Sequence, residues 1–178
     1  GSDYYIHFSL DQRDYSGGAV ALWNMQFDLT PYLATGALVF QAKSKNGGEI
    51  VTVGLGDDEK SDGWKAVVRL PLSKYGVLKK GEWTTYMIPL RDFGKRGVAW
   101  DATKGIEIPM PFQWDNVQEF RLLSNKGDNP DCEVDMDNIQ IYADAVGEST
   151  EEPTEDWLDL DKNSDGPTPA QMKLDDEI

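Results

Sequence analysis

The sequence predicts an all-β protein, an antiparallel two-sheet β-sandwich of the jelly-roll type. Three observations lead to this prediction. Apolar and polar residues alternate in many short runs over the first 143 residues, which is the pattern of half-buried strands. The segments between these runs, such as 45–48 and 125–130, are rich in glycine, asparagine, aspartate and lysine, the residues of hairpins and loops. No long run has a convincing helical pattern, so many short strands joined by polar turns favour a sandwich.

The strands follow from this alternation in chain order. In the first, Ile6 and Phe8 point to one side and His7 points to the other. Single helical turns are expected at 73–75 and at 90–93, where a strand runs out through a proline. The predicted strands span 4–10, 19–27, 37–42, 49–55, 65–72, 84–88, 119–124 and 132–142.

The last strand contains a change of phase. Val134 and Met136 are apolar at even positions, whereas Ile139 and Ile141 continue the apolar pattern at odd positions. A β-bulge near Asp137 reconciles the two halves, because a bulge inserts one residue and turns the following side chains to the other face.

Charge divides the chain into two parts. Residues 1–143 hold 20 acids and 15 bases, and residues 144–178 hold 12 acids and 2 bases, so the balances of −5 and −10 add to −15. We therefore expect a β-sandwich domain over 3–143 and an acidic linker or tail over 144–178. This charge disfavours nucleic acids and anionic membranes as partners and favours neutral ligands.

Two further residue patterns narrow the possibilities. No segment approaches the roughly 18 consecutive apolar residues of a membrane-spanning helix. Cys132 is the single cysteine, which excludes a disulfide within the chain, and its phase with Val134 predicts a buried, unreactive thiol. The lone His7 lies in a strand without a second histidine or a cysteine for a zinc site, so we interpret it as structural.

The acidic residues of the last strand suggest an enzyme. Glu133, Asp135 and Asp137 alternate, and the pattern resembles the catalytic strand of family 16 glycoside hydrolases. Such a hydrolase would use Glu133 and Asp137, but a retaining pair needs its carboxyl groups only about 5 Å apart. Asp137 is also shorter than the glutamate of that motif. The hydrolase therefore stands as the second alternative.

The order of three motifs gives a broader resemblance. They are the segment from Trp83 to Phe93, the segment from Trp114 to Leu123, and the closing strand from Val134 to Ile141. Together they resemble the galactose-binding-like β-sandwich of carbohydrate-binding modules, in particular family 11 modules and the C-terminal domains of family 3 β-glucosidases. The resemblance implies a non-catalytic module and a structural Ca²⁺ ion held in part by Asp137. It also implies an extracellular, periplasmic or cell-surface location.

Sugar binding would depend on aromatic rings, because a pyranose stacks its apolar face on a flat ring while polar side chains bind its hydroxyl groups. Three tryptophans lie among polar residues, in segments that we expect to be loops. Asp101 and Asp115 each directly follow one of them, and Arg121 lies in the strand at 119–124. The predicted ligand-binding residues are Trp64, Trp100, Trp114, Asp101, Asp115 and Arg121.

The predicted function is a non-catalytic module of a polysaccharide-acting protein. Its partners would be a neutral polysaccharide or oligosaccharide and a catalytic domain in the same parent protein. The first alternative is an accessory structural domain of a glycoside hydrolase that binds no sugar itself. It is favoured by the absence of a tyrosine platform on the strand that carries Arg121 and Leu123.

Overall fold

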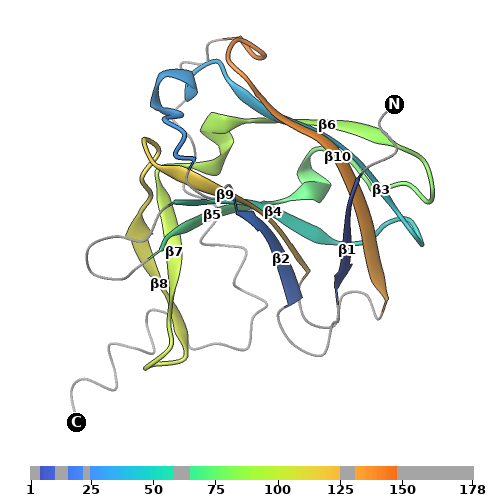
Figure 1. Ribbon diagram of the computed structural model, residues 1–178, viewed down its shortest axis with the longest axis horizontal. Helices are drawn as coiled ribbons and strands as arrows, with labels where there is room; N and C mark the ends of the chain where they lie inside the picture. The colour runs from blue at the N-terminus through green and yellow to red at the C-terminus, as the bar shows by residue number, and fades with distance from the viewer. Residues whose placement is uncertain (1–4, 11–15, 22–24, 58–64, 125–130, 148–178) are drawn as a thin grey trace.

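The computed structural model describes residues 5–10, 16–21, 25–57, 65–124 and 131–147. These residues form two packed antiparallel sheets, so the predicted fold class is confirmed (Figure 1). Short 3-10 turns connect the strands at η1 (Thr30–Tyr32), η2 (Leu72–Lys74) and η3 (Leu90–Phe93). Sheet A contains, in spatial order, β1 (Ile6–Leu10), β10 (Cys132–Tyr142), β3 (Ala37–Ser44) and β6 (Thr84–Pro89). Sheet B contains β2 (Ser16–Ala21), β9 (Val117–Ser124), β4 (Val51–Asp57), β5 (Val67–Pro71), β7 (Arg96–Asp101) and β8 (Ile106–Pro111).

The predicted bulge in β10 is confirmed. The register of β10 against β3 shifts between Asp137 and Gln140, and Asn138 has a positive φ of 53°. Asparagine tolerates this left-handed conformation better than most residues. The backbone N–H of Asn138 donates to Oδ1 of Asp137 at 2.7 Å, which stabilises the bulge.

Strands β7 and β8 were missed by the sequence interpretation. Strand β8 contains Pro109 and Pro111, and proline has no N–H to donate to a sheet. Strand β8 lies at the edge of sheet B and pairs only with β7, so it needs donors on one side only. Trp100 therefore lies in a strand and not in the loop that the sequence suggested.

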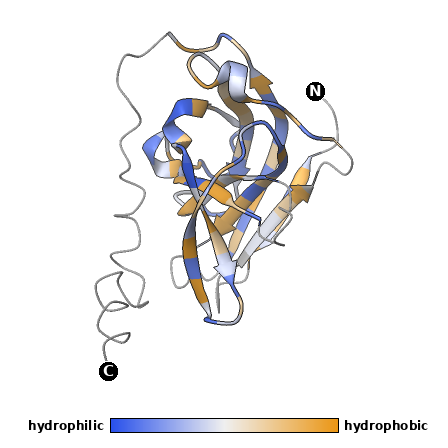
Figure 2. Cartoon of the chain, turned by 90° about the vertical axis from the view of Figure 1, so that its left-hand side faces the viewer, coloured by the Kyte–Doolittle hydropathy of each residue, from blue (hydrophilic) through white to orange (hydrophobic). Residues whose placement is uncertain are grey.

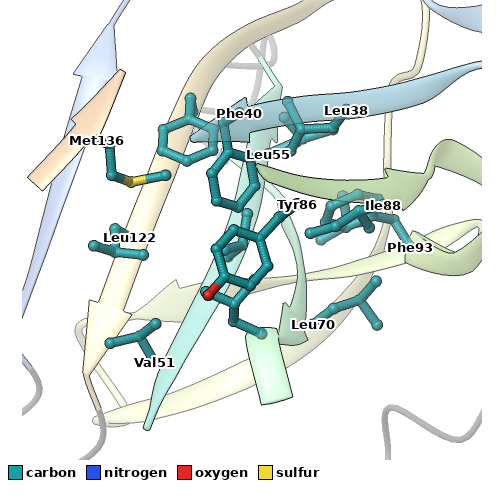
Figure 3. Close-up of a cluster of buried hydrophobic side chains, with 14 of the residues drawn as sticks. Leu38, Phe40, Val51, Leu55, Leu70, Tyr86, Ile88, Phe93, Leu122 and Met136 are labelled. Atoms are coloured by element: carbon teal, nitrogen blue, oxygen red, sulfur yellow. The ribbon is translucent and has the colours of Figure 1, made fainter. Parts of the chain in front are cut away.

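The core lies between the two sheets and contains aromatic rings from both (Figure 3). Phe40 of β3 stacks on Tyr86 of β6 with ring centroids 5.4 Å apart, and it meets Phe120 of β9 edge to face at 5.9 Å. The Tyr86 hydroxyl donates to the Val77 carbonyl oxygen at 3.0 Å, which satisfies the polar end of a buried ring. Figure 2 shows that hydrophobic and hydrophilic residues alternate along the strands.

Cys132 is buried, as predicted. Burial raises the pKa of its thiol to about 11, and the nearby Glu49 carboxylate acts in the same direction, while a hydrogen bond with Ser124 partly opposes them. A thiol with this pKa holds almost no reactive thiolate at neutral pH. Within the described part of the chain, no helix is long and apolar enough to cross a membrane.

Candidate functional site

The outer surface of sheet B, which we call the sheet B face, gathers charged side chains around a glycine-containing central strand. Alternation along β9 turns Phe120 and Leu122 into the core and Arg121 outward. In the register of the sheet, Gly54 of β4 lies between Arg121 of β9 and Arg69 of β5. This face includes Gly17, Gly54, Gly56, Lys65, Arg69, Trp100, Glu107, Glu119, Arg121 and Leu123.

Two glycines keep this face flat. A Cβ atom at Gly56 would lie 2.9 Å from Oε2 and 3.1 Å from Cβ of Glu119, so the missing side chain leaves room for Glu119 to lie over β4. A Cβ atom at Gly17 would overlap the Leu123 side chain, which lies across β2 in the same way. Long side chains therefore lie along the sheet surface where they would otherwise project from it.

Glu119 is held by two cations. Its Oε1 accepts from Lys65 Nζ at 2.5 Å, and its Oε2 accepts from Arg121 Nε at 2.8 Å and Nη2 at 2.6 Å. Burial of Glu119 favours the neutral carboxyl group, but the hydrogen bonds from Lys65 and Arg121 outweigh it and lower the pKa below 4.5. The group is thus a preorganised carboxylate at neutral pH.

A second ion pair crosses the other half of the face. Arg69 of β5 donates from Nη1 and Nη2 to Oε1 and Oε2 of Glu107 at 2.8 and 2.6 Å, a bidentate arrangement. This pair bridges β5 and β8 and passes over β7, which lies between them. Glu107 pairs in register with Trp100, whose side chain is 58% exposed. The face therefore presents an open indole beside a bidentate ion pair.

The structure places two of the predicted ligand-binding residues, Trp100 and Arg121, on this face. Trp64 lies in 58–64, outside the described residues. The sequence interpretation overlooked Lys65, Arg69, Glu107 and Glu119. Alternation along β9 could have indicated Glu119, because it lies two residues before Arg121 and shares its side of the strand.

The prediction for Trp114 is wrong. Its side chain is 7% exposed and packs edge to face on Phe112 and Phe93 at centroid distances of 4.9 and 6.5 Å. The indole Nε1–H donates to the Gly94 carbonyl oxygen at 3.2 Å. Trp114 thus belongs to the core and leaves no ring face open to a sugar.

The prediction for Asp101 is also corrected, since this residue is 8% exposed and caps a turn. Its Oδ1 accepts from the backbone N–H groups of Thr103 at 3.0 Å and Lys104 at 3.2 Å. The carboxylate thereby stabilises the β7–β8 connection and is occupied within the fold. Asp115 is exposed in the turn that precedes β9, apart from the residues that define the sheet B face.

The acidic residues of β10 lie on the outer surface of sheet A, which we call the sheet A face. Glu133 pairs with Lys45 at 2.6 Å, and Asp135 pairs with His7 at 2.7 Å and with Lys43 at 3.4 Å. Glu133 and Asp137 are four residues apart on one strand, roughly 13 Å along it, because each residue advances about 3.3 Å. Each carboxylate is engaged within the fold, Glu133 by Lys45 and Asp137 by the Asn138 N–H, so no observation in the structure supports a catalytic pair.

Asp137, the predicted calcium ligand, lies at the bulge of β10. Among the described residues, no three acidic, histidine or cysteine side chains are grouped to hold a metal ion. One carboxylate oxygen of Asp137 already accepts the Asn138 N–H. The described residues alone therefore do not form a calcium site, and the ion stays a prediction of the family resemblance.

Comparison with known families decides the class of this sandwich. Residues 4–143 match the model of carbohydrate binding domain 30. The chain belongs to this family. The family 30 domain is a non-catalytic carbohydrate-binding module, so the resemblance to carbohydrate-binding modules predicted from the motifs is confirmed. Comparison with curated proteins gave no significant match.

Solved structures share the fold of this family 30 domain. A family 30 module of a cellulosomal cellulase of Clostridium thermocellum aligns with a TM-score of 0.59 and 22% identity, covering 78% of this chain and 74% of that one. A further family 30 module aligns with a TM-score of 0.61 and 21% identity, covering 87% and 75%. A family 11 module from Clostridium thermocellum aligns with a TM-score of 0.50 and 12% identity, covering 80% and 78%.

Proposed function

We propose that this module binds a neutral β-linked glucan chain on the sheet B face. The exposed indole of Trp100, beside the Arg69–Glu107 ion pair, carries the proposal. A pyranose ring stacks on an indole, while neighbouring N–H groups and carboxylate oxygens bind its hydroxyl groups. A flat surface between β9 and β8 accommodates an extended chain better than a deep pocket would.

The charges of the face support a neutral ligand. Glu119 is neutralised by Lys65 and Arg121, and Glu107 by Arg69. An uncharged sugar does not compete with these pairs, so it leaves their geometry intact on binding. The guanidinium N–H groups donate and the carboxylate oxygens accept, which matches the two roles of a sugar hydroxyl.

The similar structures support the ligand class. One is a module of a cellulosomal cellulase, and the family 11 module is in complex with a β-1,3-1,4-mixed-linked tetrasaccharide. We therefore propose a β-glucan ligand, an extracellular or cell-surface location, and attachment to a catalytic domain that acts on the same polysaccharide. The module would hold that catalytic domain close to its substrate and raise its effective concentration there.

Affinity gel electrophoresis tests the proposal. Mixed-linkage β-glucan and hydroxyethylcellulose in the gel should retard the protein, whereas galactomannan should retard it less. Trp100→Ala should weaken binding at least about tenfold, because it removes the stacking surface. Tyr32→Ala is the matched control, since Tyr32 is an exposed aromatic residue in η1, outside the sheet B face. Equal retardation of wild type and Trp100→Ala would show that the sugar binds elsewhere.

A further inference from the structure

Two exposed aromatic rings meet on the sheet A face, on the opposite side of the sandwich from Trp100. Tyr5 directly precedes β1 and Trp83 directly precedes β6, the two edge strands of sheet A. Three strand spacings, roughly 14 Å, separate these edges. Yet the ring centroids lie 6.0 Å apart, with planes at 69°. Both rings must therefore lean inward across β10 and β3, so they lie over the sheet.

Lys43 of β3 holds the rings in this position. Its Nζ lies 4.7 Å from the Trp83 ring centroid and 5.2 Å from the Tyr5 ring centroid, within the range of cation–π contacts. The same Nζ lies 3.4 Å from Oδ2 of Asp135, and the Oδ1 of that carboxylate is 2.7 Å from Nδ1 of His7. We call Tyr5, Lys43 and Trp83 the Tyr5/Trp83 cluster. Its geometry is fixed before any ligand arrives, which lowers the entropic cost of binding.

The rings remain open to ligand although they are fixed. Tyr5 is 50% exposed and Trp83 is 38% exposed. Neither residue was among the predicted ligand-binding residues. Polar groups surround them: Nδ2 of Asn138 donates to Oε1 of Gln41 at 2.9 Å, and Gln41 lies two residues before Lys43 on the same side of β3. Open aromatic rings bordered by amides and a carboxylate are what a pyranose requires.

The charges around the cluster narrow the ligand further. The acids on the outer side of β10 are Glu133, Asp135 and Asp137, and the described cations facing them are Lys43 and Lys45, with His7 beside Asp135. This balance repels an anionic ligand. Charged pairs also lie between the exposed apolar side chains of this face. The face therefore lacks the continuous apolar patch that a protein partner of ordinary size would cover. A neutral sugar fits both conditions.

We infer that the Tyr5/Trp83 cluster is a second glycan-binding site. The inference rests on the proposed function for the class of ligand. The core separates sheet A from sheet B, so their outer faces point away from each other and one short oligosaccharide cannot contact both. A module with two such faces binds two chains of a polysaccharide at once, which gives it avidity for ordered or concentrated glucan.

Titration with cellotetraose and with a β-1,3-1,4-mixed-linked tetrasaccharide, followed by NMR of the tryptophan indole N–H signals, tests the inference. The chain has six tryptophans, and variants assign the signals of Trp83 and Trp100. We expect the Trp83 signal to move with saturation, and to do so equally in Trp100→Ala. Tyr5→Ala should weaken binding at this face at least about tenfold, as measured by the Trp83 signal, and both Tyr5→Ala and Trp83→Ala should leave the shift of Trp100 unchanged. Met87→Ala, an exposed residue of β6 outside the cluster, is the matched control for folding and for general surface effects.

The outcomes separate the two proposals. If the Trp100 signal moves and the Trp83 signal stays constant up to about millimolar sugar, the second site is overturned and the proposed function stands. If only the Trp83 signal moves, the second site stands and the placement of binding on the sheet B face is overturned. If neither signal moves, both are overturned. Precipitation of soluble mixed-linkage β-glucan by the wild type would independently support two sites if it is lost in Trp83→Ala. Only a bivalent module crosslinks polysaccharide chains.

Discussion

The two outer faces of the sandwich expose aromatic rings in different ways. On the sheet B face, Trp100 projects from within a strand, and Glu119 lies flat over Gly56 on the other half of the face. On the sheet A face, Tyr5 and Trp83 come from opposite edge strands and meet above Lys43. The first arrangement depends on small residues that make room, and the second depends on a cation that draws two rings together. One sandwich can therefore expose aromatic rings in two ways. Small residues can leave room for neighbouring side chains to lie flat, or side chains from distant strands can meet above a cation.

The largest effect in this comparison should come from filling the space at Gly56. In Gly56→Leu the new side chain collides with Glu119, so the Glu119–Arg121–Lys65 group must move. We expect the free energy of unfolding to fall by about 1–3 kcal/mol and binding at the sheet B face to be lost. The shift of the Trp83 indole with sugar should persist. Urea unfolding and the NMR titration measure both effects.

Gly147→Ala is the matched control for this substitution. A Cβ atom at Gly147 would have no neighbour within 4 Å, so stability and binding should not change. Loss of the sheet A response in Gly56→Leu would contradict the independence of the two faces.

A smaller effect should come from Glu119→Gln, which leaves Lys65 and Arg121 without their carboxylate. At pH 7 we expect a loss of about 1–1.5 kcal/mol in the free energy of unfolding, because the glutamine amide oxygen can still accept part of these hydrogen bonds. The folded-state pKa of Glu119 lies below 4.5, so its ion pairs stabilise the wild type above pH 4.5, and this stability is lost as the pH falls through the lowered pKa. The difference in stability between wild type and variant should therefore shrink below pH 4.5.

Glu82→Gln provides the comparison for an exposed ion pair. Lys79 and Glu82 are 2.6 Å apart, but both side chains are more than half exposed, so the substitution should cost less than about 1 kcal/mol. Chemical denaturation of both variants between pH 7 and pH 3 would check the two expectations. A constant difference between wild type and Glu119→Gln across this range would exclude titration of Glu119 as its source.

The smallest effect concerns the calcium ion predicted from the family resemblance. Asp137 supplies one carboxylate among the described residues, so an ion held there would raise the melting temperature only slightly. Calorimetry in calcium and in chelator should show this increase in wild type and not in Asp137→Ala. Identical melting of the wild type under both conditions would contradict a calcium site.

Strand periodicity predicted much of this fold. It gave the fold class, the bulge beside Asp137 and the buried Cys132, because alternation is a local property of the chain. It missed β8, which contains Pro109 and Pro111. Only the position of β8 at the sheet edge makes these prolines compatible with a strand.

The candidate site was only partly predictable. Trp100 and Trp114 have similar polar neighbours in the sequence, yet one is 58% exposed and the other 7%. What separates them is the packing of the Trp114 ring against Phe112, two residues before it, and against Phe93, which the fold brings from a distant segment. The local sequence contains Phe112 but shows neither that the two rings pack together nor that Phe93 covers them.

The sequence by itself thus determined the alternation of the strands and the class of sandwich. The tertiary structure decided which aromatic rings are open. Tyr5 and Trp83 lie far apart along the chain, and only the order β1-β10-β3-β6 puts their strands at the two edges of one sheet, with Lys43 between them. The physical reason is that periodicity sets the side of a strand on which a residue lies, whereas exposure depends on the neighbours that the fold supplies.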